Sequence, residues 1–188
     1  ERESLITCNY CYNKTFYFDK VISCIAYDEI SKKLILDYKY KNKTYLCRYI
    51  VNLMKEKFIL ENIKADYILY VPLHKKRLKK RGFNQSERIA SRLSEVVDIP
   101  VLDCIERVKN TKRLYNMNKI NREKELKNGF SIKENINLIK NKSIILIDDI
   151  FTTGSTVNEI SKILKINGVN HICVFTLLTT YVDTYAKE

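Results

Sequence analysis

The residues best suited to chemistry lie together between positions 144 and 156. An apolar run there leads into two adjacent carboxylates, Asp148 and Asp149, and then into a turn rich in hydroxyl groups at the start of a helix. Ionised carboxylates only accept hydrogen bonds, so an acid pair suits the donating hydroxyl groups of a ribose diol. A helix N-terminus offers unpaired N–H groups and the positive end of its dipole to a phosphate. The run therefore predicts a site for a phosphorylated sugar.

The turn itself supplies the groups that we expect to contact the phosphate. Gly154 has no Cβ and allows a close approach of the backbone. Its neighbours add hydroxyl donors: Thr152, Thr153, Ser155 and Thr156. Each feature alone has a structural explanation, because acids can follow a strand in a turn and Ser or Thr can cap a helix. Their combination favours the phosphate site, and no glycine precedes a lysine as in a Walker loop, nor is G-x-G-x-x-G present.

Strands and amphipathic helices alternate around this run. The apolar residues 67–71 predict a buried strand that Pro72 stops, and the β-branched residues 143–147 predict a strand covered on both faces. A helix is expected over residues 155–166 and a last strand over 171–178. This order predicts an α/β fold with a parallel sheet and right-handed crossovers, in which ligands bind at the carboxyl ends of the strands.

Two helices are expected before these strands. Asp28 is placed to cap the first helix and Thr44 the second. The apolar face of the first helix would consist of Ile30, Leu34, Ile35 and Tyr38. Residues 84–87 have the spacing of a capping box and predict a third helix. The polar residues 108–128 are only weakly patterned, and we expect a loop there, called the hood segment below.

The formal net charge of +12 comes mostly from residues 74–127, which carry 16 Lys and Arg but seven Asp and Glu. Such an excess suits phosphorylated ligands or nucleic acid, and it is equally typical of a solvated, lysine-rich surface. No apolar run approaches the length of a membrane span, and the first residues lack the pattern of a signal peptide. The six cysteines are therefore expected as thiols or metal ligands in a reducing cytoplasm.

Residues 147–156 resemble the signature of class I phosphoribosyltransferases, and nearly the whole chain is similar to the ComF competence family. The similarity rests on Val71-Pro-Leu-His74, Arg81-Gly-Phe-Asn-Gln85, Arg107 with Thr111, Arg122, Phe130 and Asp37-Tyr-Lys39-Tyr. Two positions depart from the family, which usually has Gln in place of Leu114 and Asn in place of Glu125. Both departures concern the contacts of the hood segment and leave the phosphate loop unaffected.

The resemblance implies a class I phosphoribosyltransferase-like fold, a twisted parallel sheet flanked by helices, that binds phosphoribosyl pyrophosphate with Mg²⁺. It assigns the ribose 2′ and 3′ hydroxyls to Asp148 and Asp149, and the 5′-phosphate to the loop 152–156. The basic turn after the strand 67–71 becomes the pyrophosphate loop, for which a cis peptide bond within residues 73–77 is implied. The candidate ligands of this loop are His74, Lys75, Arg77 and Arg81.

The function implied by the family is the cytoplasmic handling of DNA during natural transformation, with single-stranded DNA and a competence helicase as partners. In that case the lysines of the basic turn would contact a nucleic-acid backbone: Lys75, Lys76, Lys79 and Lys80. The residues alone indicate no more than a phosphoribosyl binder, so two alternatives stay open. One is an active phosphoribosyltransferase of nucleotide metabolism or salvage. The other is a non-enzymatic sensor of phosphoribosyl pyrophosphate.

Cys8 and Cys11 form a Cys-x-x-Cys pair, which is half of a structural zinc site. ComF proteins carry an N-terminal zinc finger with paired cysteines. By resemblance, residues 1–20 are interpreted as the remnant of such a module and residues 21–188 as the phosphoribosyltransferase-like domain. Zn²⁺ is expected only in a longer chain that restores the missing pair. The other cysteines are expected as core thiols: Cys24, Cys47, Cys104 and Cys173.

Residues 1–188 alone are therefore expected to bind less than one zinc ion per chain, because one pair of cysteines cannot complete a four-ligand site. Cys24, which follows Cys11 by 13 residues, is the candidate for a third ligand. Elemental analysis of the purified chain measures its zinc content. Stoichiometric zinc would contradict the interpretation of a truncated finger.

Overall fold

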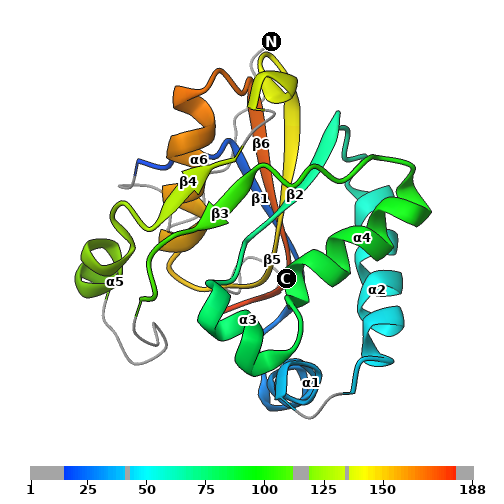
Figure 1. Cartoon of the computed structure of the whole chain (residues 1–188). Helices are drawn as coiled ribbons and strands as arrows, with labels where there is room; N and C mark the ends of the chain where they lie inside the picture. The colour runs from blue at the N-terminus through cyan, green and yellow to red at the C-terminus, as the bar shows by residue number, and fades with distance from the viewer. Residues whose placement is uncertain (1–14, 41–42, 112–118, 134–135, 181–188) are drawn as a thin grey trace.

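A parallel sheet of four strands forms the centre of the structure, a computed structural model that describes residues 15–40, 43–111, 119–133 and 136–180. The strands lie in the order β1–β6–β5–β2, so that β6 and β5 occupy the middle (Figure 1). Their bounds are Lys20–Ala26 for β1, Tyr67–Tyr70 for β2, Ser143–Phe151 for β5 and His171–Thr179 for β6. The predicted α/β fold with a parallel sheet is confirmed.

The first half of β5 is buried on both faces. Its fully buried residues are Ile144, Ile145, Leu146 and Ile147. They pair with residues 67–70 of β2 on one side and with residues 172–175 of β6 on the other. The apolar run is continuous rather than alternating because helices cover both faces of this strand.

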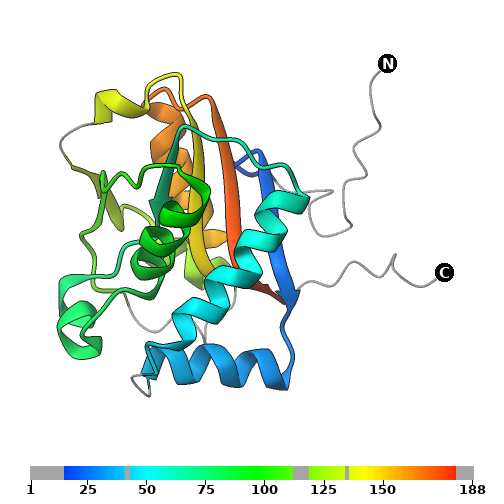
Figure 2. The ribbon, with the colours of Figure 1, turned by 90° about the vertical axis from the view of Figure 1, so that its right-hand side faces the viewer.

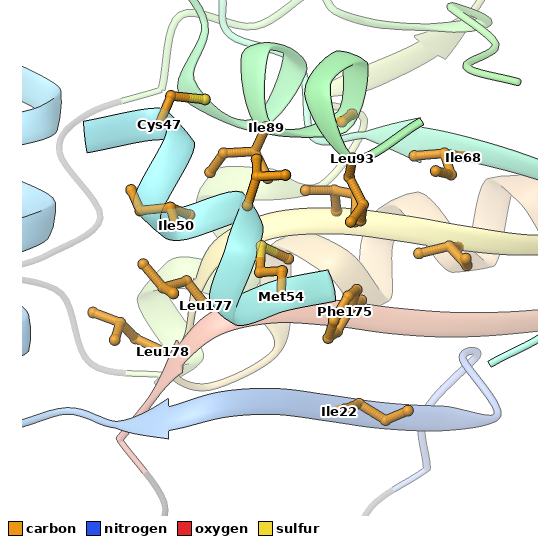
Figure 3. Close-up of a cluster of buried hydrophobic side chains, with 14 of the residues drawn as sticks. Ile22, Cys47, Ile50, Met54, Ile68, Ile89, Leu93, Phe175, Leu177 and Leu178 are labelled. Carbon is orange, nitrogen blue, oxygen red and sulfur yellow. The ribbon is translucent and has the colours of Figure 1, made fainter. Parts of the chain in front are cut away.

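Three helices cover one face of the sheet: α1 (Glu29–Tyr40), α2 (Leu46–Leu60) and α4 (Gln85–Val97). Ile50 and Met54 of α2 meet Ile89 and Leu93 of α4 in one buried cluster above Phe175 of β6 (Figure 3). Figure 2 shows α2 lying along this face, while α1 crosses beneath the carboxyl ends of the strands. The C-terminal end of α1 is therefore placed at the edge where a ligand site is expected.

The other face is covered by α6 (Ser155–Ile166), α5 (Lys119–Leu126) and a small antiparallel sheet of β3 (Ile105–Arg107) and β4 (Phe130–Ile132). Val157, Ile160 and Leu164 of α6 share a second buried cluster with Ile144 and Leu146 of β5. Two short helices complete the described chain: α3 (Lys75–Arg81) and the 3-10 helix η2 (Ile136–Ile139). None of the helices in the described ranges combines the length and the apolar character that crossing a membrane requires.

The start of α1 differs in one respect from the prediction. Asp28 does cap the helix, since its Oδ1 accepts a hydrogen bond from the N–H of Ser31, but Ser31 Oγ in turn accepts one from the N–H of Asp28. Ser31 Oγ also donates to the carbonyl oxygen of Ala26. This reciprocal cap turns Ser31 inward and leaves Ile30 81% exposed, so Ile30 does not belong to the apolar face.

Two other predictions need correction. α2 begins at Leu46 after Tyr45 as its N-cap residue, so Thr44 is not the cap. The hood segment, predicted as a loop, contains α5, while Leu114 lies in residues 112–118, outside the described part of the chain. The weak amphipathic pattern of α5 explains the error, because packing against α6 rather than intrinsic periodicity stabilises this helix.

Candidate functional site

The acid pair lies on β5 at the carboxyl edge of the sheet, as predicted. The strand continues past the acids to Phe151, so Asp148 and Asp149 precede its end instead of forming it. Asp149 is 6% exposed, whereas Asp148 is half-buried. The two adjacent carboxylates therefore have different surroundings, and they differ in their partners as well.

Asp149 is held by two donors that come from other elements. Lys39 Nζ of α1 lies 2.6 Å from Asp149 Oδ2, and the side chains of this ion pair are only 14% and 8% exposed. The Gln85 Nε2 amide of α4 donates to the same oxygen over 2.8 Å. The negative charge of Asp149 is thus balanced by a buried cation and one neutral donor.

The helices bring these donors to the acid for reasons that the local structure explains. Lys39 follows the fully buried Tyr38 and lies one helical turn after the buried Ile35, so it projects from the inner side of α1. Asn84 caps α4 by accepting a hydrogen bond from the N–H of Ser86, and its Nδ2 donates to the carbonyl oxygen of Val71. This bond ties the start of α4 to the end of β2 and places Gln85 beside β5.

Asp148 is less well compensated than Asp149. Its Oδ1 accepts hydrogen bonds from Ser86 Oγ at 3.3 Å and from the N–H of Asp149 at 2.8 Å. Burial, and then the negative charge of Asp149, raise the pKa of Asp148 well above that of an ordinary aspartate, and these bonds and Lys39 offset the rise only in part. A ligand that donates hydrogen bonds would therefore stabilise the ionised form of Asp148 more than that of Asp149.

A hollow of about 60 Å³ lies directly beside Asp148, lined by that residue, by the end of β5 and by the start of α6 (residues 150–157). It contains all five predicted loop residues: Thr152, Thr153, Gly154, Ser155 and Thr156. Gly154 is the N-cap of α6 and adopts a left-handed conformation with φ of 71°. Thr153 Oγ1 accepts a long hydrogen bond of 3.5 Å from the N–H of Ser155, and because glycine has no side chain to accept from the other N–H groups of the first turn, these are suited to an anion.

Aromatic residues pack behind this loop. A Cβ at position 154 would come within 2.9 Å of the Phe151 ring and 3.5 Å of Phe16, so glycine is required there by both conformation and space. Phe16 stacks on Phe18, which meets Phe151 edge to face. The chain segment before β1 therefore supports the loop between β5 and α6.

The basic turn after β2 has a different conformation from the one predicted. It is a helix, α3, and not a loop, because His74 Nδ1 caps it by accepting from the N–H of Lys76. His74 is extended, with φ of −65° and ψ of 142°, and no cis peptide bond occurs in the described residues, which include 73–77. The cis peptide implied by the family resemblance is therefore wrong for this structure.

The cations of α3 lie in three different environments. Arg81 donates to Gln85 Oε1 and to the hydroxyl of Tyr40, over whose ring it stacks at 4.9 Å. Arg77 Nη2 donates to the carbonyl oxygen of Thr111 in the hood segment over 2.7 Å, while Lys75 is exposed. The ends of β2 and β5 are adjacent, but the residues that line the hollow beside Asp148 include none from α3.

Arg107 on β3 is a buried cation that the residue pattern did not assign to the site. It is 7% exposed, its Nη2 donates to Thr111 Oγ1, and its Nε has no hydrogen-bond partner among the residues that the structure describes. Burial, and then the nearby Arg77, lower its pKa to about 10, while Asp148 acts in the opposite direction. The hood side of the site is therefore positively charged.

The described residues offer a magnesium ion at most the two carboxylates of the acid pair, Asp148 and Asp149. Mg²⁺ prefers octahedral coordination by oxygen atoms, usually from one or two carboxylates together with water and phosphate. No group of three or more His, Cys, Asp or Glu side chains in the described part of the chain is arranged for a metal, and Asp149 is engaged by Lys39. A magnesium ion would therefore depend mainly on oxygens that a ligand brings with it.

The cysteines fall into two groups. Cys8 and Cys11, the predicted zinc ligands, lie outside the described residues. The other four are free thiols, of which three are buried and Cys24 is half-buried. Burial raises the pKa of Cys24 to about 12, and the other three thiols also have raised pKa values because of burial. These four residues behave as the predicted core thiols.

Three partners of the acid pair were missed as site residues: Lys39, Gln85 and Ser86. The sequence does contain a signal for Lys39, which lies four residues after Ile35 on the face predicted to be apolar. A lysine in that position is costly unless it is paired. Gln85 and Ser86 have a weaker signal, since polar residues are common in the first turn of any helix.

Residues 78–188 match the Phosphoribosyl transferase domain family. The chain is 33% identical over 176 residues to competence protein F of Haemophilus influenzae, covering 90% of this chain and 77% of that protein. It is 25% identical over 181 residues to the DNA utilization protein YhgH of Salmonella typhi, covering 93% and 78%.

Among solved structures, the fold is similar to that of the glutamine phosphoribosylpyrophosphate amidotransferase from B. subtilis complexed with ADP and GMP. The TM-score is 0.51 at 18% sequence identity, over 75% of this chain and 30% of that one. At this identity the likeness shows the fold alone.

Replacing Asp148 by Asn is expected to stabilise the protein near neutral pH. Because the folded state raises the pKa of Asp148, the wild type loses stability as the pH rises from about 4, the ordinary pKa of an aspartate, through the raised value. The asparagine side chain does not ionise, so the variant gains stability above this window and not below it. Each unit by which folding raises the pKa corresponds to about 1.4 kcal/mol in the free energy of unfolding. Each kcal/mol in turn shifts Tm by roughly 2–4 °C.

Thermal melts between pH 4 and pH 8 measure this effect, and Asp66→Asn provides the matched control. Hydrogen bonds from the N–H of Ser143 and from Lys142 lower the pKa of Asp66, so its ionised form stabilises the fold. That variant is expected to lose stability above the ordinary pKa, opposite in sign to Asp148→Asn. Equal Tm values for Asp148→Asn and wild type at pH 8 would contradict the raised pKa.

Proposed function

This chain belongs to the ComF competence family and carries a phosphoribosyl transferase domain, and we propose on that basis that it binds phosphoribosyl pyrophosphate. The observation that carries the proposal is the position of a half-buried, poorly compensated Asp148 beside the open N-terminus of α6. An acceptor for sugar hydroxyls and a set of N–H donors for a phosphate are thereby placed on one hollow. The distance between them is short because β5 and α6 are joined by only three residues.

In this proposal different residues contact the phosphate, the ribose and the pyrophosphate of the ligand. The 5′-phosphate lies on the N–H groups and hydroxyls of residues 152–156, and Asp148 accepts a hydrogen bond from the ribose. The pyrophosphate extends toward the neighbouring end of β2, where His74, Lys75 and Arg77 begin α3. Arg81 acts indirectly, since it contacts Gln85. Any Mg²⁺ accompanies the diphosphate oxygens.

The cellular role that we propose is cytoplasmic handling of single-stranded DNA during DNA uptake, together with a competence helicase. The names of the relatives, a competence protein and a DNA utilization protein, support a role of this class. The exposed lysines beside the site provide a second support: Lys75, Lys76, Lys79 and Lys80. Transfer of ribose 5-phosphate to a nitrogen nucleophile and sensing without turnover are the alternatives, and release of pyrophosphate on adding a nitrogenous acceptor distinguishes them.

Thr156→Asp is expected to weaken binding of phosphoribosyl pyrophosphate without unfolding α6. The new carboxylate would lie in the first turn, where a negative charge favours the helix but repels an anionic ligand. Calorimetric titration should show a loss of affinity of about tenfold or more. Thr156→Asn, which has the same shape without the charge, should retain most of the affinity. Equal affinities of the two variants would place the phosphate elsewhere.

A DNA role predicts that Lys79→Gln with Lys80→Gln weakens binding of a single-stranded oligonucleotide. Each lost phosphate contact should reduce the slope of log K against log salt by about 0.7. Fluorescence anisotropy at several salt concentrations measures this slope. The control is Lys33→Gln with Lys55→Gln, which removes the same charge from exposed positions of α1 and α2. Equal losses in both double variants would mean that α3 does not contact the DNA.

A further inference from the structure

A groove of about 490 Å³ lies between the end of α3 and the outer face of α4. None of the residues that line it also lines the hollow beside Asp148. Pockets that bind small organic ligands commonly have volumes of roughly 300–1,000 Å³, so the groove has room for a group as large as a nucleotide. Its lining comes from both helices and from the turn between them: Leu78, Gly82, Phe83, Asn84, Glu87, Arg88, Ser91 and Arg92.

Phe83 and Arg88 form a stacked pair in this groove. The Arg88 guanidinium lies over the Phe83 ring, 4.6 Å from its centroid. The same ring packs against the fully buried Tyr38, with 5.5 Å between the ring centroids, so the core holds the pair in place. Space beside the pair is open, because a Cβ at Gly82 would meet no atom within 4 Å. Unpaired nucleobases stack on guanidinium planes as they do on aromatic rings.

A second arginine–aromatic pair lies at the other end of the same turn. Arg81 stacks over the ring of Tyr40 at 4.9 Å, and Tyr40 is 64% exposed. Single exposed aromatic residues are common on protein surfaces. Two rings that each carry a guanidinium and flank one turn are instead the combination of stacking surface and cation that proteins use for single-stranded nucleic acid.

The charges in and around the groove favour a phosphate backbone. Arg88 and Arg92 line it together with one acid, Glu87. Arg92 also contacts Glu95 at 3.3 Å, but both side chains of this ion pair are more than 60% exposed, at 65% and 62%, so water weakens it. Exposed lysines on α3, at positions 79 and 80, add further positive charge beside Leu78.

We propose that the groove between α3 and α4 binds unpaired bases of single-stranded DNA, with Arg88 on Phe83 as the stacking platform and Arg92 as a phosphate contact. This inference rests on the proposed DNA role and adds the surface that recognises the bases. Lysines alone attract any polyanion, whereas a stacking platform requires bases that are not paired. The DNA and the sugar phosphate then bind on different sides of the start of α4, since Gln85 contacts Asp149 while Arg88 lines the groove.

The test measures fluorescence anisotropy with a single-stranded oligonucleotide and with an abasic oligonucleotide of the same length, which keeps the phosphates and lacks the bases. The wild type should bind the first about tenfold or more tightly, because stacking contributes to affinity at each base that it engages. Arg88→Lys keeps the charge but lacks the planar guanidinium. This variant should lose most of the preference for bases, while its slope of log K against log salt stays unchanged.

Arg92→Lys is the matched control, because it makes the same exchange one helical turn further along the same groove. It should retain the preference for bases, since a lysine still contacts a phosphate. A single-stranded oligonucleotide that carries 5-iodouracil locates the bound base by photo-crosslinking, and the adduct is expected within residues 82–92. Circular dichroism establishes that each variant is folded.

The outcomes distinguish this inference from the proposed function. Absence of wild-type binding to either oligonucleotide would refute the proposed DNA role itself. Equal wild-type affinity for both oligonucleotides, an undiminished preference in Arg88→Lys, or a crosslink confined to other segments would overturn the groove as the base site, while the electrostatic DNA role remains. If Arg88→Lys does not fold, the wild-type comparison and the crosslink still decide.

Discussion

Two consecutive carboxylates near the end of a central, covered strand must be compensated by groups from elsewhere in the chain. The strand itself provides only the N–H of Asp149, which Asp148 accepts. Everything else comes from helices: Lys39 from α1, and Gln85 and Ser86 from α4. Uncompensated burial of either charge would cost several kcal/mol, a large part of the stability of an ordinary domain. The packing of α1 and α4 on this edge is therefore constrained by electrostatics as well as by apolar area.

The two acids of the site differ in how far their negative charges are compensated. Asp149 is fixed by Lys39 and Gln85, and its charge is neutralised by Lys39. Asp148 remains under-compensated, with a raised pKa, next to the N-terminus of a helix that starts with glycine. Ligand-binding sites commonly contain charged groups whose burial is incompletely compensated, and the stability of the rest of the fold tolerates this cost. One consequence is that Asp149→Ala is a poor probe of binding, since it would leave Lys39 buried without its counter-charge.

The sequence alone was sufficient for three of the four strands of the central sheet, β2, β5 and β6, and for the position of the phosphate loop. Continuous β-branched runs and an acid pair before a hydroxyl-rich turn have few alternative explanations, and α6 begins and ends at the predicted residues 155 and 166. The basic turn was harder, because a short lysine-rich stretch has no apolar face and gives no sign that His74 will cap a helix. Lys39 and Gln85 act on a residue more than sixty positions away, and contacts at that separation depend on packing that local patterns do not encode.

The strand order has a consequence for synthesis on the ribosome. Among the described strands, β1 is made first and pairs with β6, which is made last, so Lys20 finds its partner Cys173 only after β2 and β5 have been made. β6 is also the strand that joins β1 to β5. Until residues 171–179 leave the exit tunnel, β1 and one edge of β5 lack their partner strand β6 and can pair with other strands. Contacts of such long sequence separation form slowly, so this architecture leaves strand edges open to aggregation until β6 has been made.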